Sequence, residues 1–302
     1  MKSKIKIGLL EFGIRSNKSN NPIQSIYEVI DYAVAADNLG FSRFWLTENY
    51  IKNRKDMAWS TPEMLLPIIL GMTDNINVGI AGLIINTHNP FRIAHNYKLL
   101  SNIYTGRVDI GIVKGSLEDS ILNRFDIDLK SNRSSFKGKI NQLLDYLRCE
   151  DDLLSEGIVV PPFLGGIPDV WYLGSSYQNF NYIIENKLNF GRTIFHENAN
   201  KDHKLKEFKF FQSQYFSANG VKPKTVLTFS GYCHSSRRKI SLNESESKIP
   251  IDAINIIGPP DLFYEKLLEY QEFYGYDEFI FNNVSVNQKQ SLATLENIAK
   301  YM

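Results

Sequence analysis

Cysteine is scarce in this sequence, with only Cys149 and Cys233 among its 302 residues. Two cysteines allow one disulfide at most, so the disulfide framework of a small secreted protein is excluded. They form no CxxC pair, and no two histidines stand at metal-ligand spacing beside a carboxylate. The sequence therefore predicts no metal site, and a reducing environment is the default.

An excess of charge of one sign and long apolar runs are also missing. Lys and Arg number 34 against 33 for Asp and Glu, so no overall field would attract nucleic acid or an anionic membrane. The short basic cluster at 237–239 is predicted to be a solvated loop. No stretch of about 20 apolar residues occurs, and the N-terminus has no signal-peptide run. We expect a cytoplasmic protein without nucleic-acid or membrane partners.

Several motifs that would identify an enzyme class directly are absent. There is no GxGxxG turn after an early strand, no P-loop and no GxSxG elbow. These absences argue against a dinucleotide-binding doubly wound sheet, a P-loop nucleotidase and an α/β-hydrolase.

What the sequence does contain is a regular alternation of short apolar runs with amphipathic segments. The predicted strands cover 5–12, 43–47, 76–85, 108–113, 170–173, 189–195, 226–232 and 278–282. The predicted helices cover 22–40, 63–72, 90–104, 133–147, 177–185, 204–216, 261–270 and 290–300. Strands that alternate with helices require a parallel sheet, and about eight such units favour a closed (β/α)8 TIM barrel. We expect one α/β domain over residues 1–302, with the doubly wound sheet as the alternative fold.

In such a barrel the informative residues follow the carboxyl ends of the strands. These positions hold Glu11, Glu48, Asn49, Tyr50, the segments 81–82, 86–89, 114–116 and 174–176, and His196 with Glu197. Two long connections, 49–60 and 118–132, also follow strands and are expected to rise from the same face.

One group of these residues suggests a phosphate site. Gly174, Ser175 and Ser176 are predicted to end a strand and start a helix, where backbone N–H groups and hydroxyls converge on an anion. Lys114, at the end of another strand, would supply positive charge. The alternative is that a serine only caps the helix and that Lys114 is a solvated lysine.

Other strand-end residues are candidates for contact with a substrate. Asn49, His88 and His196 could each present a polar group, although a lone histidine at a strand end is more often structural. The aromatic residues near several strand ends suggest an apolar pocket for a small molecule whose identity the sequence does not specify.

Three stretches together resemble the bacterial luciferase-like monooxygenase superfamily. Segment 39–50, LGFSRFWLTENY, is similar to the family's G-F-x-x-x-W-x-x-E-H-H pattern. Segment 99–115, LLSNIYTGRVDIGIVKG, is close to L-D-x-L-S-x-G-R-x-x-x-G-x-x-R-G, and segment 77–82 runs on to Pro90, Arg92 and Ala94 as in the family. A weaker match is the IGPP at 257–260. The resemblance is specific as a set and strongest over residues 25–116.

The resemblance implies a barrel that binds reduced FMN, or a deazaflavin, at its carboxyl-terminal face. Ala81-Gly82 matches a position where the family often carries a non-prolyl cis peptide beneath the flavin ring. Lys114 occupies the place of a phosphate-binding arginine, and 174–176 matches a second phosphate-holding turn. Glu48, Asn49 and His196 are then the implied catalytic positions, and a homodimer and a separate flavin reductase are the implied protein partners.

The departures from the family pattern leave the reaction open. Asn49-Tyr50 stands where luciferases carry His-His, and asparagine cannot shuttle a proton near neutral pH. Val113 stands where luciferase has a reactive thiol. We therefore keep three hypotheses: an FMN-dependent monooxygenase, a flavin- or deazaflavin-dependent reductase that transfers hydride to an unsaturated substrate, and a non-catalytic flavin-binding protein.

Overall fold

Eight parallel strands close into a barrel in the computed structural model, which describes residues 5–14, 21–51, 54–115, 117–125, 135–195, 205–246, 254–276 and 278–302. The barrel strands are β1 (Lys6–Glu11), β2 (Arg43–Leu46), β3 (Asn77–Ile84), β4 (Val108–Val113), β5 (Asp169–Gly174), β6 (Asn189–Thr193), β7 (Thr225–Cys233) and β9 (Glu278–Asn283). Each pairs in parallel with its neighbour, and β9 closes the ring between β7 and β1. The predicted (β/α)8 barrel is confirmed.

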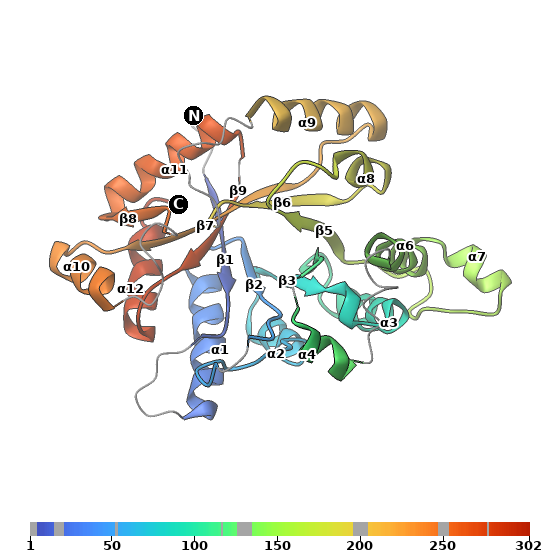
Figure 1. The fold of residues 1–302 in the computed structure, drawn as a ribbon, viewed down its shortest axis with the longest axis horizontal. Helices are drawn as coiled ribbons and strands as arrows, with labels where there is room; N and C mark the ends of the chain where they lie inside the picture. Colours follow the sequence, from blue (N-terminus) through green and yellow to red (C-terminus); the bar gives the residue numbers. More distant parts are fainter. Residues whose placement is uncertain are drawn as a thin grey trace.

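The helices lie around the outside of this barrel (Figure 1). The main ones are α1 (Pro22–Asn38), α2 (Leu65–Met72), α3 (Pro90–Ile103), α6 (Ser135–Arg148), α8 (Phe180–Glu185), α9 (Leu205–Asn219), α11 (Pro260–Tyr274) and α12 (Gln288–Ala299). Shorter elements are η1 (Ile85–Thr87), α4 (Asp119–Leu122), η2 (Asn123–Phe125) and α7 (Glu150–Ser155). In the described ranges, no helix combines the length and apolar character needed to cross a membrane.

Local sequence explains where two of these helices begin. Asn21 and Asn89 each precede a proline, and each side chain accepts hydrogen bonds from the first free backbone N–H groups of its helix. An asparagine cap followed by proline at the first helical position is a strong start signal, because it satisfies orphan donors and pre-sets the backbone.

The basic cluster at 237–239 is a correction to the sequence prediction. It lies at the start of α10 (Arg237–Glu246), not in a loop. The helix is polar, but its Asn243 is fully buried and accepts from the N–H of Val286 at 3.1 Å. A contact this distant in sequence leaves no trace in local periodicity. The short β8 (Ile256–Gly258), which pairs with the end of β7 outside the barrel, was likewise not predicted.

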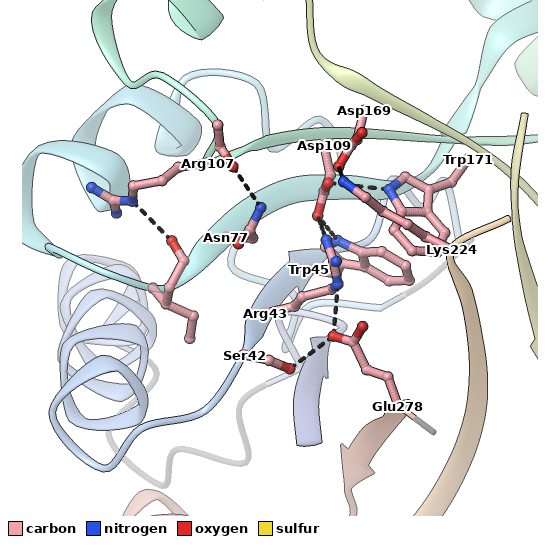
Figure 2. A network of polar contacts seen from close by, with 12 residues as sticks. Ser42, Arg43, Trp45, Asn77, Arg107, Asp109, Asp169, Trp171, Lys224 and Glu278 are labelled. Carbon is pink, nitrogen blue, oxygen red and sulfur yellow. Dashed lines mark hydrogen bonds and ion pairs between the residues drawn. The ribbon is translucent and has the colours of Figure 1, made fainter. Parts of the chain in front are cut away.

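The amino-terminal end of the barrel interior is filled by a buried network of charged groups and indoles (Figure 2). Arg43 of β2 contacts Asp109 of β4 at 2.6 Å and Glu278 of β9 at 2.8 Å. The indole N–H groups of Trp45 and Trp171 donate to the same Asp109 carboxylate at 2.9 and 3.1 Å. Burial lowers the pKa of Arg43, but the two carboxylates raise it by more, so the guanidinium stays charged.

Candidate active site

A cavity of about 300 Å³ opens where the first six strands end. Its walls are apolar where Leu10, Ala81 and Leu173 meet, and the rings of Phe12 and Phe195 pack edge to face across it with centroids 6.3 Å apart. This is the face on which barrel enzymes keep their chemistry. A mainly apolar cleft with a few polar groups is typical of a small-molecule site.

The structure brings five of the predicted site residues together around this cavity. They are Glu48, Asn49, Ala81, Gly82 and Gly174. The predicted catalytic residue His196 lies outside the described residues.

Lys114, Ser175 and Ser176 lie just beyond the cavity lining. β4 and β5 are parallel neighbours with Ile112 paired to Tyr172, so both chains leave the sheet at the same edge two residues later. Lys114 and Ser175 are both exposed there. The backbone at Lys114 and the serine turn therefore lie on the same side of the cavity mouth.

The serine turn does not start a helix, which corrects the sequence prediction. α8 begins at Phe180, four residues after Ser176, and is only six residues long. The intervening Tyr177 is buried, and its hydroxyl lies 3.0 Å from that of Tyr276. Burying this ring fixes a turn before the helix, so a helix dipole does not contribute to an anion site here.

Arg192 holds the serine turn from behind. It is fully buried on β6, its Nε donates to the carbonyl oxygen of Ser175 at 3.3 Å, and its guanidinium lies over the ring of Tyr177 at 5.1 Å. Sequence reasoning missed Arg192, because an arginine within a strand gives no local sign of its partner.

Ala81 and Gly82 line the cavity, and at Gly82 the backbone reaches it without a side chain. The peptide bond between them is cis, as the resemblance implied. A Cβ built at Gly82 would come within 2.7 Å of Cγ2 of Val113 on the neighbouring strand. Only glycine fits between β3 and β4 at this point.

Glu48 is the centre of a hydrogen-bond cluster at the rim of the cavity. Glu48 is 3% exposed. Its carboxylate accepts hydrogen bonds from the N–H of Ile84 at 2.7 Å, from Tyr50 Oη at 2.7 Å and from Thr87 Oγ1 at 3.1 Å. Nε2 of His88 lies 3.0 Å from both carboxylate oxygens. Three donors and one imidazole nitrogen surround this buried carboxylate, so both of its oxygens have polar partners inside the protein.

His88 contacts two carboxylates, although the sequence suggested it as a substrate ligand. Its Nε2 faces Glu48, and its Nδ1 lies 3.6 Å from Glu63 Oε1. Lys139 of α6 fixes the backbone here, because its Nζ donates to the carbonyl oxygens of Asn86 and His88 at 2.6 and 2.9 Å.

Asn49 and Tyr50 complete the polar rim. The Asn49 amide donates to Thr47 Oγ1, and its backbone N–H donates to Ser60 at 3.0 Å. Burial, and then the Glu48 charge, raise the pKa of Tyr50 far above its ordinary value, so the phenol stays neutral. The ring of Phe125, from η2 in the long β4–α6 connection, packs against that of Tyr50 with centroids 5.2 Å apart.

Over the described ranges, no cluster of three His, Cys, Asp or Glu side chains has the arrangement of a metal site. Cys149 and Cys233 are both free thiols.

Sequence similarity to known proteins covers about half of the chain. A family model described as luciferase-like monooxygenase matches residues 7–159. The uncharacterized protein YwcH of Bacillus subtilis is 28% identical over 166 residues, 54% of this chain and 49% of that protein. The N-acetyl-S-alkylcysteine monooxygenase of the same organism is 24% identical over 159 residues, 51% of this chain and 47% of that protein. The chain therefore aligns with about half the length of these relatives.

Solved structures match the whole barrel at low sequence identity. The structure of apo-MsnO8 has a TM-score of 0.80 at 20% identity and covers 98% of both chains. The oxygenating constituent of 3,6-diketocamphane monooxygenase from Pseudomonas putida, in complex with FMN, has a TM-score of 0.79 at 15% identity over 99% of this chain and 98% of that one. An F420-dependent secondary alcohol dehydrogenase has a TM-score of 0.71 at 12% identity, over 99% and 98% of the two chains. At such identities the likeness concerns the fold.

Proposed function

The chain belongs to the luciferase-like monooxygenase family, and from this premise we propose that it is an FMN-dependent monooxygenase that uses reduced FMN on a small organic substrate. The observation that carries the proposal is the cavity at the carboxyl ends of β1–β6, with Lys114 and the 174–176 turn at one side of its mouth. The reduced flavin would come from a separate flavin reductase.

The residues present fit a flavin. A flat ring needs an apolar floor and a close approach to backbone, which Leu10, Leu173 and the side-chain-free Gly82 supply. An anionic tail needs a cation and hydrogen-bond donors, which Lys114, Ser175 and Ser176 supply at the same edge. Lysine acts there as a point charge, without the two-pronged contact of an arginine.

When bound, reduced FMN would supply electrons for the activation of dioxygen or for hydride transfer. The chain's own residues would orient the ring and exclude water through Phe12 and Phe195, and present polar groups through Glu48 and Asn49. The Glu48 carboxylate would be held in place at the rim by the N–H of Ile84 and the hydroxyl of Tyr50. His196 stays a proposed acid or base from its sequence position.

The alternative is a reductase that uses FMN or a deazaflavin. It is favoured by one observation: Asn49 and Tyr50, which cannot act as a neutral-pH acid–base pair by themselves, line the cavity where the family pattern has two histidines. Turnover under anaerobic conditions would support the reductase, and strict dependence on dioxygen would rule it out.

The proposed phosphate site gives a direct test of the cofactor. Replacing Lys114 with alanine is expected to weaken FMN binding by about tenfold or more, because one charge-assisted contact contributes roughly 1.5–3 kcal/mol. Riboflavin, which lacks the phosphate, should bind equally to both proteins. Fluorescence titration with each flavin measures the two dissociation constants.

The control for that titration is Lys222→Ala, which removes an exposed lysine between α9 and β7 at the opposite end of the barrel. It should leave both constants unchanged. Equal losses for FMN and riboflavin in Lys114→Ala would contradict the phosphate role. Absence of binding of FMN and of a deazaflavin to the wild-type protein would overturn the proposed function.

We also propose a homodimer through one face of α2. The aromatic and apolar residues of 59–70 could serve either an interface or barrel packing, and α2 divides these two roles between its faces. Leu66 and Ile69 pack inward, whereas Met64, Ile68 and Met72 form an exposed stripe at four-residue spacing. An apolar stripe of this kind is typical of a protein–protein interface.

Replacing Ile68 with glutamate is expected to convert such a dimer into a monomer, because the charge would be desolvated in the interface. Size-exclusion chromatography with light scattering measures the mass. The matched control is Phe210→Glu, since Phe210 is 64% exposed on α9, on another side of the barrel (Figure 1). A wild-type protein that is monomeric at all concentrations would contradict the proposal.

The single-domain organisation of 1–302 and the cytoplasmic location stay predictions.

A further inference from the structure

A continuous line of polar groups leads from the cavity to the protein surface. It starts at Tyr50, which lines the cavity, and passes through Glu48 and His88 to Glu63. We propose that these four side chains form a proton relay between the reacting group in the cavity and solvent. This inference rests on the proposed function, because it assigns the proton path of the same site.

Exposure increases along the line in the direction that a relay requires. The Glu48 side chain is 0% exposed, the His88 side chain 14% and the Glu63 side chain 22%. A proton that reaches Glu63 is therefore at the edge of bulk water, whereas one on Glu48 is not.

His88 is suited to carry the proton between the two carboxylates. Its two ring nitrogens face different partners, Nε2 towards Glu48 at 3.0 Å and Nδ1 towards Glu63 at 3.6 Å. An imidazole can accept a proton on one nitrogen and release one from the other. The two contacts of Lys139 with the backbone at 86 and 88 hold the ring in this position.

Tyr50 gives the line its end in the cavity. Its hydroxyl donates to Glu48 at 2.7 Å, and the phenol oxygen still has a lone pair for a group in the cavity. The relay uses the Nδ1–H tautomer of His88, whose Nε2 is free to accept. As a proton arrives on the phenol oxygen, the phenol proton passes to the Glu48 carboxylate, which hands it on to Nε2 of His88, and the Nδ1 proton passes to Glu63 and then to water. One proton enters and one leaves, and the reverse sequence delivers a proton to the cavity.

The surroundings of the line carry few other ionisable groups. Thr87 donates to Glu48, and the buried Tyr97, whose pKa is raised by burial and by the charges of Glu63 and Glu48, faces the same carboxylates. The Tyr97 hydroxyl is buried and has no hydrogen-bond partner among the described atoms.

The relay also explains why the Asn49-Tyr50 departure is compatible with proton transfer. Asparagine and tyrosine replace the two histidines of the family pattern, but Tyr50 connects the cavity to an imidazole that comes from a separate segment, residue 88 after η1. An imidazole is therefore still connected to the cavity, through Tyr50 and Glu48, although it does not line the cavity itself.

The test compares three near-isosteric or conservative variants, Tyr50→Phe, His88→Gln and Glu63→Gln. The substrate is unidentified, so the probe is oxidation of protein-bound reduced FMN by dissolved oxygen. Each variant is expected to slow this oxidation by about tenfold or more, with loss of the solvent deuterium isotope effect, since positioned acid–base groups contribute roughly 10²–10⁴-fold to a rate. The Tyr50→Phe/His88→Gln double variant should be no slower than either single variant, because groups in one line act as a unit.

Two controls separate a relay from a structural role. FMN dissociation constants should stay unchanged in His88→Gln and Glu63→Gln, and His95→Gln, which changes a half-buried histidine of α3, should behave as wild type. Additive losses in the double variant, or an isotope effect that survives in Tyr50→Phe, would overturn the relay.

A second readout needs no flavin. In protein labelled with 15N-histidine, the His88 ring N–H signals, identified by their loss in His88→Gln, should exchange with solvent several-fold more slowly in Glu63→Gln than in wild type. Unchanged exchange would contradict the relay even if FMN binds. Slower exchange in a protein that binds no flavin would leave the relay standing and the proposed function refuted.

Discussion

Replacing Arg43 with methionine is expected to lower the free energy of unfolding by about 3–5 kcal/mol, the usual cost of removing one partner from a buried ion pair. The change would leave Asp109, which is fully buried, facing Glu278 without a cation between them. Urea unfolding followed by fluorescence of the tryptophans measures the effect.

The matched control is the exposed ion pair in the same region of the molecule (Figure 2). Lys224 contacts Asp169 at 2.5 Å, but the two side chains are 57% and 31% exposed. Lys224→Met should therefore cost less than about 1 kcal/mol. If Arg43→Met and Lys224→Met lower the free energy of unfolding equally, the buried network does not stabilise the fold more than the exposed ion pair does.

Replacing Gly82 with alanine is expected to weaken flavin binding by roughly tenfold to a hundredfold. The new methyl group would overlap both Cγ atoms of Val113, and overpacking of this kind costs about 1–3 kcal/mol and moves the backbone. The displaced backbone is the part of β3 that lines the cavity. FMN titration and the unfolding midpoint are measured together.

A second substitution makes this prediction specific. Val113→Ala removes the two Cγ atoms, so the Gly82→Ala/Val113→Ala double variant should recover most of the lost affinity. Gly138→Ala, where a Cβ has nothing within 4 Å, should leave binding unchanged. If the double variant binds no better than Gly82→Ala, the steric explanation is wrong.

The barrel could be predicted from the sequence because local signals are strong. Runs such as 76–85 and 108–113 are apolar except for Asn77 and Asp109, as expected of strands that are buried on both faces. Asn21 and Asn89 mark helix starts through contacts within three residues. The eight predicted strands correspond to the eight strands of the barrel.

The sequence predicted where the site lies in the barrel, but not which of its residues contact one another. Glu48 and His88 are 40 residues apart, and no local spacing indicates that His88 would contact Glu48 instead of lining the cavity. The helix expected from Tyr177 begins at Phe180, because burial of the tyrosine ring overrides the local pattern. In both cases, packing between distant segments decides the outcome.

The filled end of the barrel limits how molecules enter and leave the cavity. The barrel axis below the cavity is filled by the side chains of Arg43, Asp109, Trp45 and Trp171. Over the described strands, the interior is therefore open at one end only. Whatever enters must leave through the same opening, and a bulky molecule already seated there blocks the exit of anything beneath it. The order in which cofactor and substrate arrive and depart is thus constrained by architecture before any chemistry begins.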